Sequence, residues 1–182
     1  MQRQIFLSYV KADQPWAERL STMLATVPVD TSPVPSANLP GESFEASLRQ
    51  AILGASHTLV LVGPGTRRSR RVDHEIELST ERRAGGPAAR VIGVILPNHP
   101  DFRQPYYEPD HVPVRLHDLV QSEHALIRKW SEQSGDVVRW LEDATRRRTA
   151  RPMEPSLAAV AELYHFPWDE TVDEPRPAPA VA

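Results

Sequence analysis

The stretch that decides the fold is His57-Thr58-Leu59-Val60-Leu61-Val62, followed at once by Gly63-Pro64-Gly65-Thr66. Six residues of almost continuous apolar and β-branched character predict a strand that is covered on both faces. The glycines and the proline that follow predict a sharp turn. Strands covered on both faces are typical of parallel sheets whose strands are joined by helices.

The same kind of strand recurs on both sides of this stretch. Further strands are predicted at 4–9, at about 27–30 and at 90–96. The first two are followed by turn residues and then by apolar residues at helical spacing. The first helix, for example, carries Trp16, Leu20 and Leu24 at intervals of four, which places them on one face. Alternating strands and helices favour a parallel sheet with helices on both faces.

Three polar residues are predicted to cap the helices that follow the first three strands. Asp13, Ser43 and Ser69 each stand just before an apolar helical pattern, where a side-chain oxygen can accept a hydrogen bond from the first turn. The helix after Ser69 carries Val72 and Ile76 inward, and Glu75 lies on the flank of that stripe. A carboxylate there can border the sheet edge and still reach a ligand.

The later part of the chain is less regular. Residues 97–113 hold five prolines and predict an irregular connection, and Val114-Arg115-Leu116 predicts a short edge strand. A last helix is predicted from about Asp136. We therefore expect an α/β, flavodoxin-like, three-layer domain over residues 1–148, with a central parallel sheet of about five strands. Residues 149–182 are rich in proline and predict an extension that is partly docked or disordered.

The composition narrows the classes of function. A net charge of −3 does not favour nucleic-acid binding, which needs clustered positive charge. The absence of cysteine excludes disulfides, thiolate zinc sites and a cysteine nucleophile. No apolar run is long enough to span a membrane, and the first residues lack the pattern of a signal peptide. These features predict a cytoplasmic protein that binds neither nucleic acid nor membrane.

Four short stretches, in their order and spacing, resemble the TIR domain family. They are Phe6-Leu7-Ser8-Tyr9 with Asp13, Leu39-Pro40-Gly41-Glu42-Ser43-Phe44, Leu59-Val60-Leu61-Val62 with Thr66, and Ser69-x-x-Val72-x-x-Glu75-Ile76. The later region from Val114 to Trp140 is similar to bacterial TIR-like proteins of the Thoeris anti-phage kind. The resemblance covers about residues 3–148.

The resemblance implies an enzyme that breaks the bond between nicotinamide and ribose in NAD+, either to deplete NAD+ or to make a cyclic or conjugated ADP-ribose signal. NAD+ would be the substrate, with no other cofactor, and Glu75 would be the catalytic carboxylate. Members commonly have a tryptophan four residues before this glutamate, where the present chain has Arg71. That arginine could face a phosphate, or it could mark an altered pocket.

The remaining candidates for substrate binding are Ser8, Tyr9, Gly41 and Phe44, together with Arg71. Each has a structural alternative: Ser8 as a cap, Tyr9 and Phe44 as packed aromatic rings, and Gly41 as a residue of backbone conformation only. Glu75 itself could simply complement the positive end of its helix and pair with a nearby arginine. No metal site is expected, because the seven histidines show no metal-ligand spacing.

Two other functions remain open from the sequence. The long loop over residues 31–42, which in the TIR family often mediates contact between domains, is compatible with a non-catalytic assembly module. A sensor that binds a nucleotide signal without cleaving it is the third hypothesis. The partners expected on the resemblance are NAD+, further copies of the chain through TIR surfaces, and a partner effector protein.

Overall fold

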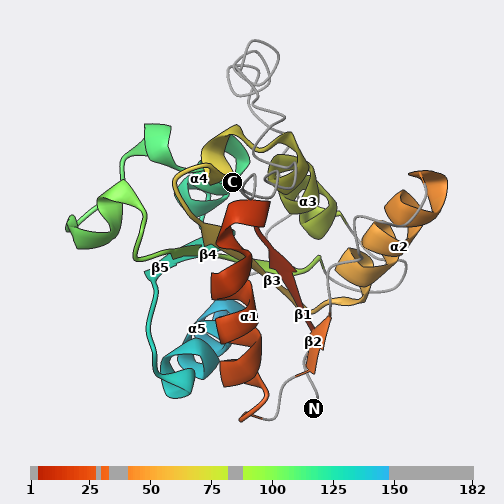
Figure 1. Cartoon of the computed structure of the whole chain (residues 1–182), viewed down its shortest axis with the longest axis horizontal. Coiled ribbons are helices and arrows are strands. Elements are labelled where there is room, and N and C mark those ends of the chain that lie inside the picture. Colours follow the sequence, from red (N-terminus) through yellow and green to blue (C-terminus); the bar gives the residue numbers. More distant parts are fainter. Residues whose placement is uncertain (1–3, 28–29, 33–40, 82–87, 148–182) are drawn as a thin grey trace, which may run out of the picture.

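Five parallel strands form one sheet in the order β2-β1-β3-β4-β5, as a computed structural model shows for residues 4–27, 30–32, 41–81 and 88–147 (Figure 1). The strands are β1 (Gln4–Ser8), β2 (Asp30–Ser32), β3 (His57–Val62), β4 (Arg90–Ile95) and β5 (Ala125–Lys129). The order is that of a flavodoxin-like domain, so the predicted fold class and the number of strands are confirmed.

Helices cover both faces of this sheet. The α-helices are α1 (Gln14–Leu24), α2 (Gly41–Gly54), α3 (Arg70–Thr80), α4 (Val114–Gln121) and α5 (Ser134–Arg146). Short 3₁₀ turns are η1 (Lys11–Asp13), η2 (Thr66–Arg68), η3 (Pro100–Arg103) and η4 (Pro109–His111). No helix in the described part of the chain has the length and apolar character needed to cross a membrane.

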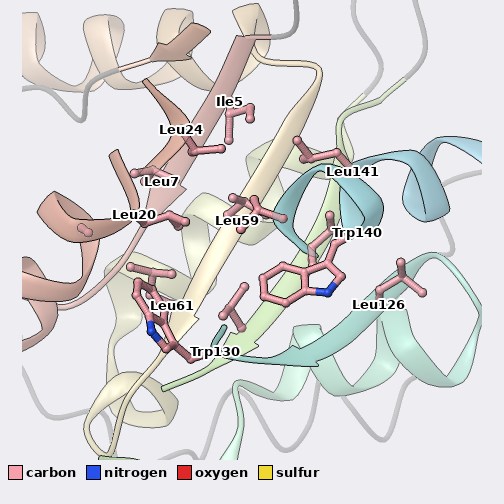
Figure 2. Close-up of a cluster of buried hydrophobic side chains, with 14 of the residues drawn as sticks. Ile5, Leu7, Leu20, Leu24, Leu59, Leu61, Leu126, Trp130, Trp140 and Leu141 are labelled. Atoms are coloured by element: carbon pink, nitrogen blue, oxygen red, sulfur yellow. The ribbon is translucent and has the colours of Figure 1, made fainter. Parts of the chain in front are cut away.

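Side-chain alternation along the strands decides which helix packs on which face. Ile5 and Leu7 of β1 join the core cluster of α1 and α5, in which Trp130 and Trp140 are the largest side chains (Figure 2). Phe6 lies on the opposite face, in a cluster with α2 and Leu78 of α3. Because successive residues of a strand point to opposite faces, Ser8 also points toward the α2, α3 and α4 layer.

The strand order reverses beside β1. Strand β1 pairs with β2 on one side and with β3 on the other, where Ser8 lies opposite Val60. In an open α/β sheet the crevice at the carboxyl ends of such strands is where ligands bind. A functional site is therefore expected at the carboxyl end of β1.

The prediction for residues 114–116 is wrong. Val114 begins helix α4 instead of forming an edge strand, and the edge strand is β5, eleven residues further on. Leu116, Leu119 and Val120 are spaced for a helix and pack together in one core cluster. Strand β5 escaped prediction because Arg128 and Lys129 occupy its second half, as charged residues often do on an edge strand.

Of the three predicted helix caps, one is confirmed. The backbone N–H of Val72 donates to Ser69 Oγ at 3.0 Å, so Ser69 caps α3. Helix α2 begins at Gly41, which places Ser43 inside the helix. Asp13 precedes α1 but makes no capping hydrogen bond; its side chain is buried toward Gly63 instead. The predicted extension over 149–182 lies outside the described residues, as does most of the loop 31–42.

Replacing Gly63 by alanine should destabilise the fold by about 2 kcal/mol, as overpacking a tight interior contact does. An added Cβ would lie 2.1 Å from Asp13 Oδ2, and Asp13 is only 1% exposed. The matched control is Gly135→Ala in α5, where an added Cβ meets nothing within 4 Å. Urea unfolding measures both variants. Equal midpoints would show that Asp13 moves aside without loss.

Candidate functional site

Glu75 lies on the sheet-facing stripe of α3. The buried residues of this helix include Val72, Glu75, Ile76 and Ser79, which recur at helical spacing on one face. The side chain of Glu75 is 0% exposed. The sequence placed Glu75 on the flank of the stripe, whereas the structure places it within the stripe, directed at the end of β1.

Two side chains hold the carboxylate of Glu75. The hydroxyl of Ser8 donates to Oε2 at 2.5 Å, and Arg71 Nη1 donates to Oε1 at 3.1 Å. Both contacts have the geometry of charge-assisted hydrogen bonds, which are stronger than bonds between neutral groups. A carboxyl group is costly to bury without hydrogen-bonding partners, and Ser8 and Arg71 supply such partners at the sheet edge.

Arg71 ties the same cluster to the turn after β1. Its Nη2 donates to the backbone carbonyl of Tyr9 at 2.7 Å, while its Nη1 contacts Glu75. Burial raises the pKa of the Tyr9 phenol; the positive charge of Arg71 opposes this, and the carboxylates of Glu18 and Glu75 add to it. Tyr9 is therefore a neutral hydrogen-bonding group at physiological pH, with its ring packed against the α1 and α5 cluster.

A second polar layer lies beneath Glu75. Thr58 Oγ1 and Ser79 Oγ are 2.8 Å apart, and the Ser79 hydroxyl also lies 2.7 Å from the backbone carbonyl of Glu75. Both hydroxyls are buried between β3 and α3. Buried hydroxyls paired in this way restrict α3 to one position on the sheet. They therefore determine where along β1 the side chain of Glu75 lies.

The structure thus brings four of the predicted site residues together: Ser8, Tyr9, Arg71 and Glu75. It does not bring Phe44 to them, because Phe44 packs on the Phe6 cluster with Leu48. Phe44 is therefore a packed aromatic ring, which is the structural alternative that the sequence analysis gave for it. Gly41 is the first residue of α2.

Three cavities lined by described residues lie away from Glu75. One of about 460 Å³ runs along β5, one of about 50 Å³ lies between α3 and α4, and one of about 410 Å³ lies beyond the carboxyl ends of β3 and β4. Glu75 lines none of these three.

A second buried carboxylate, that of Asp13, lies close to this edge. Asp13 contacts Thr66 Oγ1 and Asn98 Nδ2, each at 3.4 Å, and lies against Gly63. It stands just before a helix, so its sequence position signalled only a cap. The side chains that Asp13 contacts follow β3 and β4 in the chain. Asp13 can reach them only because the strands lie in this order in the sheet.

Replacing Asp13 by asparagine should change how stability depends on pH. Burial raises the pKa of Asp13 above its ordinary value of 3.8, and the hydrogen bonds from Asn98 and Thr66 oppose this only in part. The folded protein therefore keeps this proton where the unfolded chain has lost it, and wild-type stability falls as pH rises through that range. Asparagine does not titrate. The variant should gain stability relative to wild type from acid to neutral pH, measured by urea unfolding; a constant difference would contradict this.

A doubly wound parallel sheet with helices on both faces defines the class of flavodoxin-like α/β domains. Within that class the chain belongs to the TIR domain family, whose model matches residues 5–130. A search of curated proteins gives no match.

The solved structures that are similar to the chain include two from different kinds of protein. One shows the TIR domains of the activated Roq1 resistosome directly recognizing the pathogen effector XopQ. It is 15% identical in sequence, the match covers 80% of this chain and 82% of that chain, and the TM-score is 0.40. The other is of FerB, a flavoenzyme NAD(P)H:(acceptor) oxidoreductase from Paracoccus denitrificans, at 14% identity, covering 78% and 98%, with a TM-score of 0.41.

Proposed function

We propose that this TIR domain is an NAD+ glycohydrolase or cyclase that cleaves the bond between nicotinamide and ribose. The observation that carries the proposal is the carboxylate of Glu75, fully buried at the carboxyl end of β1 and held by Ser8 and Arg71. A structural role alone gives little reason to bury a carboxylate at this point, since apolar residues of similar size fill such positions at no electrostatic penalty.

The chemistry needs little more than such a carboxylate. Nicotinamide leaves as a neutral ring, so no general acid is required, and the transition state carries a developing positive charge on the ribose. A carboxylate beside the ribose stabilises that charge and accepts hydrogen bonds from the sugar hydroxyls. A ribose hydroxyl that replaces the Ser8 hydroxyl on Oε2 would make the same type of bond that Ser8 makes.

The biological role that we propose is anti-phage defence, by NAD+ depletion or by an ADP-ribose-derived signal sent to a partner effector protein. It is supported by the resemblance of the Val114 to Trp140 region to Thoeris-type proteins. The test is to incubate the purified chain with NAD+, with and without an extract of phage-infected cells, and to separate the products by chromatography. Release of nicotinamide in either condition supports the enzyme; a cyclic or conjugated product distinguishes signalling from depletion.

One observation favours a second candidate, a non-catalytic assembly module. Both carboxylate oxygens of Glu75 are engaged and the side chain is shielded from solvent, as in a purely structural ion pair. On this alternative the chain self-associates through the loop that contains Pro40 and Gly41. Light scattering tests it: joint replacement of Pro40 and Gly41 should abolish association in a protein that never cleaves NAD+.

A further inference from the structure

A second group of polar side chains lies beyond β4, separate from the Glu75 cluster. His99, Asp101 and His111 come from the connection between β4 and α4, which η3 and η4 organise. His99 is 4% exposed and Asp101 is 3% exposed, although the segment has the proline-rich sequence of a surface loop. Buried polar side chains in a connection need hydrogen-bonding partners, and here the partners are one another.

The hydrogen bonds assign the proton positions. His99 Nε2 lies 3.0 Å from the carbonyl oxygen of His111, so that nitrogen donates. His99 Nδ1 accepts from the backbone N–H of Asp101 at 3.1 Å. Both ring nitrogens are thus accounted for by a neutral imidazole, assigned from the network of partners. His99 serves to hold the backbones of Asp101 and His111 together.

Asp101 in turn orients the imidazole of His111. Its Oδ1 accepts from His111 Nδ1 at 2.9 Å, and its Oδ2 accepts from the backbone N–H of Glu108 at 2.9 Å. Burial raises the pKa of Asp101, but the hydrogen bonds from Glu108 and His111 outweigh burial, and the pKa lies below its ordinary value. A carboxylate on Nδ1 fixes the ring and leaves Nε2 as the nitrogen available to a ligand.

This imidazole borders the cavity of about 410 Å³, which also has Arg67, Arg68 and Asp110 in its lining. The volume is within the range of small-molecule pockets, roughly 300–1,000 Å³. Arg67 is fixed in place, because its Nη1 donates to the carbonyls of Pro109 and Val112 and its Nη2 pairs with Asp110 at 3.2 Å. Asp110 is 88% exposed, so this pair is readily exchanged with solvent or ligand.

We propose that this cavity is a binding site for the phosphate group of a small-molecule ligand, held by Arg67, Arg68 and His111 Nε2. Guanidinium groups match phosphate oxygens in geometry and charge, and His111, whose Nδ1–H donates to Asp101, donates from Nε2 to the same oxygens in its imidazolium form. The carboxylate of Asp110 repels an anionic phosphate. Phosphate binding therefore displaces this carboxylate from Arg67. The site uses no residue of the Glu75 cluster and stands independently of NAD+ cleavage.

Isothermal titration of inorganic pyrophosphate into the full chain at low salt tests the proposal, with adenosine as the probe without phosphate. Arg68→Gln and His111→Gln should each weaken pyrophosphate binding about tenfold, the effect of losing one charge-assisted hydrogen bond. Asp110→Asn should strengthen it several-fold, because the opposing carboxylate is gone. The matched controls are Arg139→Gln in α5 and His74→Gln in α3, which should leave binding unchanged.

Three results would overturn the proposal: no saturable pyrophosphate binding by the wild type, equal losses in Arg68→Gln and Arg139→Gln, or weaker binding in Asp110→Asn. Thermal melting checks that each variant is folded. Arg68 and Asp110 are exposed, so their variants remain informative even if His111→Gln unfolds. Glu75→Gln should bind pyrophosphate as the wild type does, so a failure of the enzymatic proposal and a failure of this site are distinguishable.

Discussion

Glu75→Gln should release nicotinamide from NAD+ about 10³-fold more slowly than the wild type, the range expected when a transition-state charge loses its stabilising group. Glutamine has nearly the same size and can still accept a hydrogen bond from Ser8, but it carries no negative charge to place beside the ribosyl cation. The contacts of Glu75 with Ser8 and Arg71 make this the cleanest substitution, because little else changes. Nicotinamide is measured at fixed times by chromatography.

The matched control is Glu77→Gln, two residues along the same helix. Its side chain is 45% exposed and pairs with Arg115, so it reports the effect of removing one α3 carboxylate far from β1. We expect it to retain wild-type activity. Equal nicotinamide release by wild type and Glu75→Gln would remove Glu75 from the mechanism and leave the assembly module as the better account. Circular dichroism establishes that both variants are folded.

The central elements could be predicted from sequence because local patterns determine them. The continuous apolar run of β3 signals a strand covered on both faces, and Ser69 fixes where α3 begins. Once that start is fixed, helical periodicity places Val72 and Ile76 toward the sheet, and Glu75 must lie next to them. Periodicity thus predicted where Glu75 lies, whereas its choice as the catalytic candidate came from the resemblance to the TIR family.

The contacts of Glu75 and Asp13 with distant parts of the chain could not be predicted in the same way. Ser8 reaches Glu75 because β1 and β3 are neighbours in the sheet, and Asp13 reaches Gly63 for the same reason. Contacts across fifty residues or more depend on strand order, which local spacing does not encode. The His99, Asp101 and His111 group was missed because its segment reads as a proline-rich loop. A strand was wrongly predicted at Val114, where the structure has a helix, because a short apolar run fits the periodicity of either element.

The Arg71 position connects the sequence and the structure most directly. The tryptophan common in the family would place an apolar ring one helical turn before the glutamate, whereas Arg71 places a charge there that contacts both Glu75 and the end of β1. The arginine thereby places a positive charge beside a fully buried carboxylate. The side chain of Arg71 therefore affects both the stability of the fold and the access of a ligand to Glu75.

Arg71→Met should consequently destabilise the fold by about 2 kcal/mol. Removing one partner of a fully buried ion pair costs about 3–5 kcal/mol, and Arg71 is 27% exposed, so solvent screening reduces the effect. The same substitution made in Glu75→Gln should cost much less, since the ion pair with residue 75 is already absent there.

Urea unfolding of the wild type, the two single variants and the double variant gives the coupling energy between residues 71 and 75. We expect it to be about 1–2 kcal/mol, as for other hydrogen-bonded charge pairs with restricted access to solvent. Arg139→Met in α5, where the arginine pairs with Asp136 at 3.4 Å and is 71% exposed, is the matched control and should change stability little. A coupling near zero would mean that Ser8 and other neighbours alone support the Glu75 charge, and that Arg71 is free to turn toward a ligand without loss of stability.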